Sequence, residues 1–99
     1  MGFLTNLKNT VFGSGIDYRE MIKNGAVLVD VRSPQEFKSG HAAGSKNIPL
    51  ANLSSKVSEL KDKEVILVCL SGGRAGQAKN ILTQAGIKAH NAGPWQRVR

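Results

Sequence analysis

The sequence predicts an α/β fold: an open, mostly parallel sheet of about four to five strands with helices on both faces. Two apolar, valine-rich runs at residues 26–31 and 64–69 are typical of strands that are buried on both faces, as in parallel sheets. Segments with helical spacing alternate with these runs, and the connections between them are short. Such alternation is the pattern of a sheet covered by helices on both sides.

The segment before the first valine-rich run contains two predicted helices. Residues 3–12 carry apolar side chains at helical spacing, so we expect residues 1–15 to form a short helix or extension ahead of a single domain at 16–99. Asp17 and Glu20 stand three residues apart, the spacing of a helix cap, and predict a helix that runs through Lys23.

A strong helix-start signal follows the first predicted strand. Ser33 is a capping residue, Pro34 suits the first helical position and Glu36 stands at the third, while Ser39-Gly40 closes the helix. Further along, we expect a short strand at 45–50, a helix that begins at Asn52 or Ser54, a strand at 64–69, a helix from about Arg74 to Ala85 and a weaker strand at 87–92.

Length and cysteine content narrow the class of protein. The 99 residues are about the length of one domain. One cysteine and two histidines are too few for an internal disulfide or a structural zinc site, so we expect no metal and no cofactor. No segment approaches the ~20 apolar residues of a membrane span, and the start of the chain lacks the apolar run of a secretory signal. We therefore expect a cytoplasmic protein without a membrane partner.

The charge of the chain is strongly positive. Lysine and arginine number 14 against 7 aspartate and glutamate, which gives a formal net charge of +7. This excess suggests an anionic ligand, an acidic partner protein or nucleic acid. Because the lysines are scattered and only five residues are aromatic, we expect no nucleic-acid partner.

The single cysteine stands where α/β sheets bind ligands, at the carboxyl end of a predicted strand. The strand runs into Cys69 and continues as Leu70, Ser71, Gly72, Gly73 and Arg74 before the next helix. Two glycines allow successive N–H groups to turn inward as an anion-binding nest, and the helix start adds unpaired N–H groups. A cation in the first helical turn opposes the helix dipole, which makes sense if an anion sits between Arg74 and the loop amides. Helix starts and nearby arginine favour the thiolate form of a cysteine.

Two other interpretations of Cys69 have to be weighed. A lone cysteine at the end of an apolar strand is most often a small buried hydrophobe, but two glycines and an arginine behind it favour a reactive group. A cysteine–histidine protease requires a histidine placed by a third group. His41 and His90 lie in different segments from Cys69, so the sequence does not favour that chemistry.

Three ordered blocks resemble the rhodanese family. Residues 30–37 (DVRSPQEF), with 40–45 (GHAAGS) and 47–49 (NIP), are similar to the first signature block of that family; residues 69–74 (CLSGGR) resemble its active loop, and residues 91–95 (NAGPW) its closing segment. The resemblance covers about residues 16–95. It implies a single-domain sulfurtransferase that takes sulfane sulfur from thiosulfate or a related anionic donor and passes it to cyanide, a thiol or an acidic carrier protein.

The resemblance also implies roles for individual residues. Cys69 would be the nucleophile and would carry the persulfide, the amides of residues 70–74 would surround the sulfur, and Arg74 would support the loop and attract the donor. Asp30 and Arg32 are expected to be supporting residues, with Asp30 bonding loop amides and Arg32 pairing with Glu36. Related phosphatases have one residue more between Cys and Arg, so the shorter loop favours sulfur over phosphate. The alternative is a module that relays persulfide or binds a partner without catalysing turnover.

Overall fold

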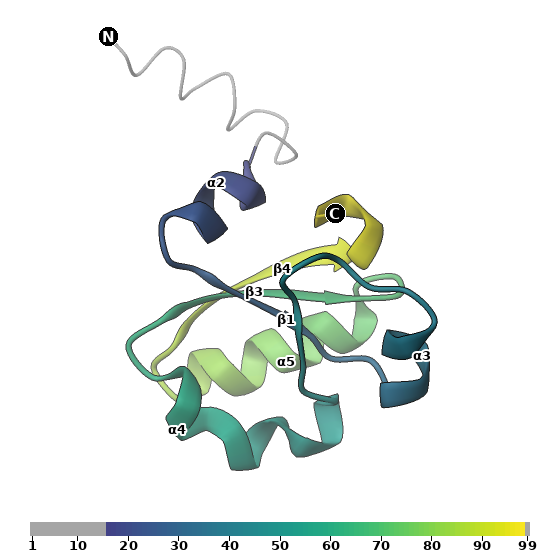
Figure 1. The fold of residues 1–99 in the computed structure, drawn as a ribbon. Helices are drawn as coiled ribbons and strands as arrows, with labels where there is room; N and C mark the ends of the chain where they lie inside the picture. The colour runs from purple at the N-terminus through teal and green to yellow at the C-terminus, as the bar shows by residue number, and fades with distance from the viewer. Residues whose placement is uncertain (1–15, 99) are drawn as a thin grey trace, which may run out of the picture.

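The computed structural model describes residues 16–98 and contains a four-stranded, fully parallel sheet (Figure 1). Its strands are β1 (Val27–Asp30), β2 (Lys46–Asn47), β3 (Glu64–Cys69) and β4 (Lys88–Pro94). They are arranged in the order β2-β1-β3-β4, and each neighbouring pair is parallel. The predicted α/β class and the buried character of the two valine-rich strands are confirmed.

One face of the sheet is covered by the helix that follows β3. This helix is α5 (Gly73–Gln84), and a 3-10 helix η1 (Leu50–Lys56) with the short α4 (Val57–Leu60) packs beside it (Figure 1). Alternate residues of β1 and β3 point to this face, as the two-residue period of a strand requires. The core on this side includes Val29, Val65, Leu67, Leu53 and Leu82.

The opposite face is covered by two short helices from the ends of the described chain. These are α2 (Tyr18–Lys23) and the 3-10 helix η2 (Trp95–Val98). The intervening strand residues Leu28, Ile66 and Val68 form the core on this side. The Arg19 guanidinium of α2 donates to the carbonyl of Val98, so the first and last described elements are tied together. Helices on both faces of the sheet were predicted, and the structure confirms them.

Two of the predicted helix starts, those of α2 and α3, are present with their capping bonds. Asp17 Oδ1 accepts from the N–H of Glu20 at 3.0 Å. At the start of α3 (Pro34–Lys38), Ser33 Oγ accepts from the N–H of Glu36 at 3.2 Å, and Glu36 Oε1 accepts from the N–H of Ser33 at 2.9 Å. This reciprocal capping box fixes the direction in which the chain leaves β1.

The segment after α3 differs from its prediction. The strand expected at 45–50 is only the two residues of β2, and the following helix begins at Leu50 rather than at Asn52 or Ser54. Beyond Asn47, Ile48 and Leu50 still donate to the carbonyls of Asp30 and Val31 at 3.0 and 3.1 Å, but the chain already turns into the 3-10 helix at Leu50. The carbonyl of Pro49 accepts the first bond of that helix from Asn52 at 2.8 Å, which accounts for its early start. The helix or extension predicted for residues 1–15 lies outside the described residues.

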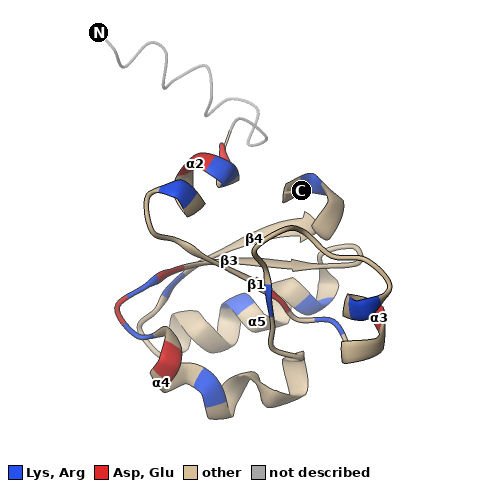
Figure 2. Ribbon diagram, in the orientation of Figure 1, with Lys and Arg blue, Asp and Glu red and all other residues tan. Residues whose placement is uncertain are grey.

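The described residues also show how the basic side chains are distributed and whether any helix could span a membrane. Lysines and arginines are distributed over α2, α3 and α5 and over the segment that leads into β3 (Figure 2). Within residues 16–98, no helix is both long enough and apolar enough to cross a membrane.

Candidate active site

The Cys69 loop, residues 69–74, occupies the turn between β3 and α5. Gly72 is the N-cap of α5 and has a φ of 107°, a left-handed conformation that favours glycine. In this conformation the Gly72 N–H donates to Cys69 Sγ at 2.9 Å, and the N–H of Ala75 approaches the same sulfur at 3.4 Å. Two backbone donors at a helix start therefore point at one sulfur atom, which stabilises negative charge on it.

Cys69 is buried, whereas most of the loop residues that follow it are exposed. Cys69 is 1% exposed, whereas Leu70 is 52% exposed. Ser71 and Gly73 are exposed as well, and Gly73 is the first residue of α5. The amides expected to surround the sulfur were those of residues 70–74. The second N–H group that approaches Cys69 Sγ belongs instead to Ala75, one residue beyond that range. The first turn of the helix thus contributes to the sulfur site together with the loop.

The sequence suggested that Arg74 faces a site for an external anion, but the structure pairs it with Glu36. Its Nη1 donates to Glu36 Oε1 at 2.7 Å and its Nη2 to Glu36 Oε2 at 3.1 Å, so α5 is joined to α3 by a forked ion pair. The guanidinium is therefore paired with a carboxylate of the chain itself rather than left for an external anion. The pair also removes Glu36 from Arg32, to which the sequence analysis had assigned it.

The ion pair changes the acid–base behaviour of both partners. The hydrogen bond from Arg74, followed by the backbone hydrogen bond from Ser33, lowers the pKa of Glu36 from 4.5 to about 2. The same carboxylate raises the pKa of Arg74, mainly through its hydrogen bond. Both groups are charged at neutral pH, and forked arginine–carboxylate contacts have a defined geometry. Glu36 thus holds the first turn of α5 in a fixed direction.

Asp30 and Arg32 form a buried ion pair at the carboxyl end of β1. Arg32 Nη2 donates to Asp30 Oδ2 at 2.7 Å and Arg32 Nε to Asp30 Oδ1 at 2.9 Å, with side chains 3% and 0% exposed. Asp30 Oδ1 also accepts from the backbone N–H of Arg32 at 3.0 Å. Asp30 therefore does bond a backbone amide after its strand. The prediction that Arg32 pairs with Glu36 was wrong, because Arg32 pairs with Asp30.

Arg32 connects three separate parts of the chain. Its Nη2 donates to the carbonyl of Gly40 at 2.7 Å, and its guanidinium carbon lies 5.1 Å from the ring centroid of Trp95. The side chain of Asn47 adds bonds to the carbonyls of Asp30 and Arg32 at 3.0 and 2.9 Å. Arg32 and Asn47 thus hold the segments of the first block together, and Arg32 also contacts the closing block at Trp95.

Asn91 contacts the Cys69 loop, although no role for this residue was predicted from the sequence. It lies on β4, and its Nδ2 donates to the carbonyl of Gly72 at 3.0 Å. Its Oδ1 accepts from the N–H of Gly93 at 2.9 Å. The sequence signal for this second bond is an asparagine two residues before a glycine, a pattern typical of a local turn. Nothing in the sequence pattern indicates its partner 19 residues earlier.

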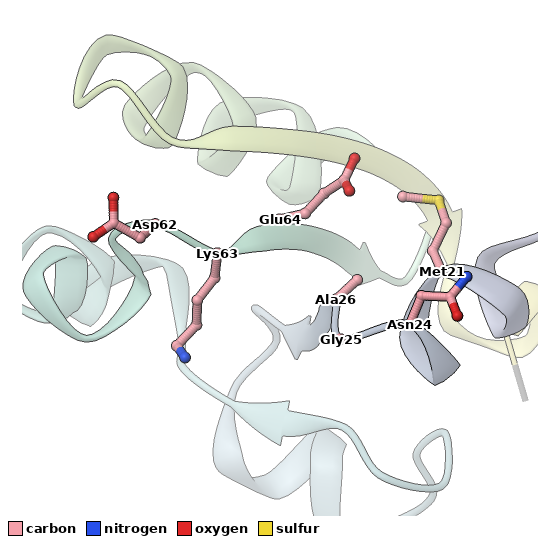
Figure 3. A pocket seen from close by; sticks show the side chains of 7 residues that line it. All are labelled: Met21, Asn24, Gly25, Ala26, Asp62, Lys63 and Glu64. Atoms are coloured by element: carbon pink, nitrogen blue, oxygen red, sulfur yellow. The ribbon is translucent and has the colours of Figure 1, made fainter.

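A hollow of about 400 Å³ lies at the opposite, amino-terminal end of the sheet (Figure 3). Its lining comes from the end of α2 and from the turn before β3: Met21, Asn24, Gly25, Ala26, Asp62, Lys63 and Glu64. Nearby, His90 Nε2 is 2.7 Å from Glu64 Oε2. This hollow is separate from the Cys69 loop, which lies beyond the carboxyl ends of the strands. Residues 16–98 contain no group of three potential metal ligands among His, Cys, Asp and Glu.

Comparison with known proteins identifies the class to which this fold and loop belong. The model of the rhodanese-like domain family matches residues 16–93, which include the whole Cys69 loop and every strand except the last residue of β4. The chain belongs to the rhodanese-like domain family.

Individual relatives agree with this assignment. The uncharacterized protein YqhL of Bacillus subtilis is 44% identical over 62 residues, which are 62% of this chain and 49% of that protein. The thiosulfate sulfurtransferase PspE of Escherichia coli is 35% identical over 69 residues, which are 66% of each chain. The chain therefore spans only about half the length of the Bacillus relative.

A solved structure shows the same arrangement in three dimensions. A rhodanese from Escherichia coli, solved with anions, superposes with a TM-score of 0.67 and 30% sequence identity. The match covers 73% of this chain and 89% of that chain. The four-stranded parallel sheet and its helices are therefore those of a rhodanese fold.

Proposed function

We propose that this domain is a sulfurtransferase that carries sulfane sulfur on Cys69 as a persulfide. The observation that carries the proposal is the direct contact of Cys69 Sγ with the N–H groups of Gly72 and Ala75 at the start of α5. These donors stabilise a thiolate before the reaction and a negatively charged persulfide after it. The thiosulfate sulfurtransferase PspE among the relatives supports the same reaction class.

In the first proposed step, the Cys69 thiolate attacks the outer sulfur of thiosulfate. A bond forms between Cys69 Sγ and that sulfur while the sulfur–sulfur bond of thiosulfate breaks, and its electron pair leaves with sulfite. Because sulfite is a good leaving group, this step needs no general acid. The positive charge of the chain and the anions found with the Escherichia coli rhodanese support an anionic donor.

In the second step, a nucleophilic acceptor attacks the outer sulfur of the persulfide. Cyanide would leave as thiocyanate and a thiolate as a new persulfide, and in both cases Cys69 returns as the thiolate. No external oxidant or reductant is consumed. Since Cys69 is 1% exposed, both steps require a movement of the surrounding chain that brings Sγ within reach of the donor and the acceptor.

The loop geometry supports sulfur rather than phosphate as the transferred group. Four residues separate Cys69 from Arg74, and the N–H groups of Gly72 and Ala75 both approach a single sulfur atom. Arg74, which would otherwise be available to bind phosphate oxygens, is engaged by Glu36. We therefore expect phosphoesters to be poor ligands of this loop.

A persulfide relay is the second candidate function, and the exposure of Leu70 favours it. Leu70 is 52% exposed in the loop that contains the nucleophile, so a partner protein that exchanged sulfur with Cys69 would meet this apolar side chain. In this case the domain would receive sulfur from one protein and pass it to another, including an acidic carrier. A cytoplasmic location, which either function would suit, stays a prediction.

A steady-state assay separates the two functions. The protein is incubated with thiosulfate and cyanide, and thiocyanate is measured against the amount of protein, with Cys69→Ser as the inactive control. Many thiocyanate molecules per protein molecule support the enzyme. Little or no thiocyanate from thiosulfate, by a protein that does accept sulfur on Cys69 from a small-molecule persulfide, supports the relay, and a wild-type protein that accepts sulfur from neither donor would contradict both.

A further inference from the structure

We propose that Asn91 is a positioning residue, which holds the Gly72 peptide in the orientation that directs its N–H at Cys69 Sγ. This inference rests on the proposed function of Cys69 and extends it to a residue on a different strand. Its basis is a continuous set of contacts from the bulged part of β4 to the sulfur atom.

The first contact in this set comes from a β-bulge in β4. Leu67 pairs with Asn91 and Val68 with Gly93, so Ala92 is an extra residue without a partner on β3. Gly93 has a φ of 79°, and its N–H donates to Asn91 Oδ1 at 2.9 Å. Bulges redirect side chains and are common beside functional sites. Here the bulge leaves Asn91 with its amide over the Cys69 loop.

The second contact fixes the carbonyl of Gly72. Asn91 Nδ2 donates to this oxygen at 3.0 Å, and the N–H of Gly76 donates to it at 2.8 Å. Both acceptor positions of the oxygen are therefore used. Gly72 has a left-handed φ and no side chain of its own to hold it, so these two bonds restrain its rotation. The N–H of this same residue is the one 2.9 Å from Cys69 Sγ.

The side-chain amide of Asn91 has one orientation that satisfies both bonds. A flipped amide would place its oxygen against the Gly72 carbonyl and its NH2 group against the Gly93 N–H. The amide also lies close to the loop and to α5. A Cβ at Gly76 would lie 3.4 Å from Asn91 Nδ2, and one at Gly72 would lie 3.8 Å from Asn91 Oδ1, both ordinary van der Waals distances.

A simpler role for Asn91 is to close the bulge through its bond to Gly93. Asn91→Asp distinguishes the two roles because aspartate has the same shape. The carboxylate still accepts from the Gly93 N–H, but it has no donor for the Gly72 carbonyl. Asn91→Ala removes both bonds. Because Asn91 is exposed, neither substitution removes a core contact.

The experiment compares wild type, Asn91→Asp, Asn91→Ala and the control Asn80→Ala, an exposed asparagine on α5. Two quantities are measured on folded protein: kcat and KM for thiocyanate formation, and the rate of hydrogen exchange at the Gly72 amide by nitrogen-15 NMR. We expect kcat to fall about five- to tenfold in both Asn91 variants, the effect of losing about one hydrogen bond, with the KM for thiosulfate little changed. Gly72 exchange is expected to accelerate by a similar factor, while exchange in β3 and in Asn80→Ala stays at the wild-type rate.

Two results would overturn the inference. If Asn91→Asp matches wild type and only Asn91→Ala is impaired, bulge closure alone explains the residue. If Gly72 exchange is unchanged in both variants, Asn91 does not restrain that peptide. The exchange measurement does not depend on activity. An inactive wild-type protein would therefore contradict the proposed sulfur transfer, while Gly72 exchange still decides the role of Asn91.

Discussion

Arg74 and Glu36 are joined by two hydrogen bonds of 2.7 and 3.1 Å, although 38 residues separate them in the chain. The arginine lies in the first turn of α5 and the glutamate in the first turn of α3, so the pair connects the two helix starts, which follow β3 and β1 (Figure 1). A cation in the first turn of a helix is unfavourable alone. The carboxylate compensates it, and the arginine fixes the helix whose amides contact Cys69.

Removal of the carboxylate charge from this pair is predicted to impair both stability and sulfur transfer. In Glu36→Gln, the amide retains only one acceptor oxygen and no charge for the guanidinium, so α5 is held less firmly. We expect a lower urea midpoint and a loss of about tenfold in kcat/KM, since small displacements near a reacting group have effects of this size or larger. Glu59→Gln is the matched control, because Glu59 pairs with Lys56 with both side chains about half exposed. Equal behaviour of the two variants would show that the Glu36–Arg74 pair is an ordinary surface contact.

Acid is predicted to remove the stabilisation that Glu36 provides. The pKa of this carboxyl is about 2 in the folded protein against an ordinary value of 4.5, so folding favours its charged form. Its contribution is therefore fully present above about pH 4.5 and is lost as the pH falls toward 2. Urea unfolding of wild type and Glu36→Gln at several pH values measures this contribution as a difference between the two proteins. We expect the difference to be constant from pH 7 to 5 and to disappear near pH 2; a difference that grows on acidification would contradict the assignment.

Breaking the buried Asp30–Arg32 pair is predicted to be the most damaging of these substitutions. In Asp30→Ala, the guanidinium of Arg32 loses its carboxylate in a site where both side chains are almost completely buried. Loss of one partner from such a pair typically costs about 3–5 kcal/mol of unfolding free energy. Equilibrium urea unfolding measures this loss. A loss below about 1 kcal/mol, as for exposed pairs, would mean that Arg32 finds compensation elsewhere.

The two consecutive glycines of the Cys69 loop are predicted to differ sharply in their tolerance of alanine. Gly72 has a φ of 107°, a left-handed conformation that side chains disfavour, so Gly72→Ala should cost about 1–2 kcal/mol and slow sulfur transfer. Gly73 is the first residue of α5 and has open space where a Cβ would stand. We expect Gly73→Ala to leave activity unchanged and to alter stability by less than about 1 kcal/mol. Thermal unfolding with the thiocyanate assay compares the two, and equal effects would show that the conformation of Gly72 is not required.

The local parts of this structure could be predicted because their causes are local. The capping box of Ser33 and Glu36 and the valine-rich strands each depend on a few consecutive residues. Proximity of Cys69 to a helix start follows from the strand–glycine–helix order alone. For this reason the fold class and the position of the candidate nucleophile were accessible from the sequence.

The pairing of charged residues was not accessible in the same way. Arg32 and Glu36 are four residues apart and were the obvious partners, yet Arg32 turns back to Asp30 and Glu36 contacts Arg74. The choice depends on how β1, α3 and α5 come together in space. The contact of Asn91 with Gly72 likewise requires both the bulge in β4 and the parallel neighbour β3. Such long-range relationships leave no periodic signal in a single sequence.

Intact-protein mass spectrometry tests the central claim most directly. Wild type and Cys69→Ser are incubated with thiosulfate, freed of excess reagent and weighed, and the loaded protein is then treated with cyanide or a small thiol. Because Cys69 is the single cysteine of the chain, we expect wild type to gain one sulfur atom, to lose it to the acceptor and to gain it again in a second cycle, while folded Cys69→Ser gains none. Wild-type protein that never gains sulfur, or a Cys69→Ser variant that gains and transfers it equally well, would contradict the proposed function.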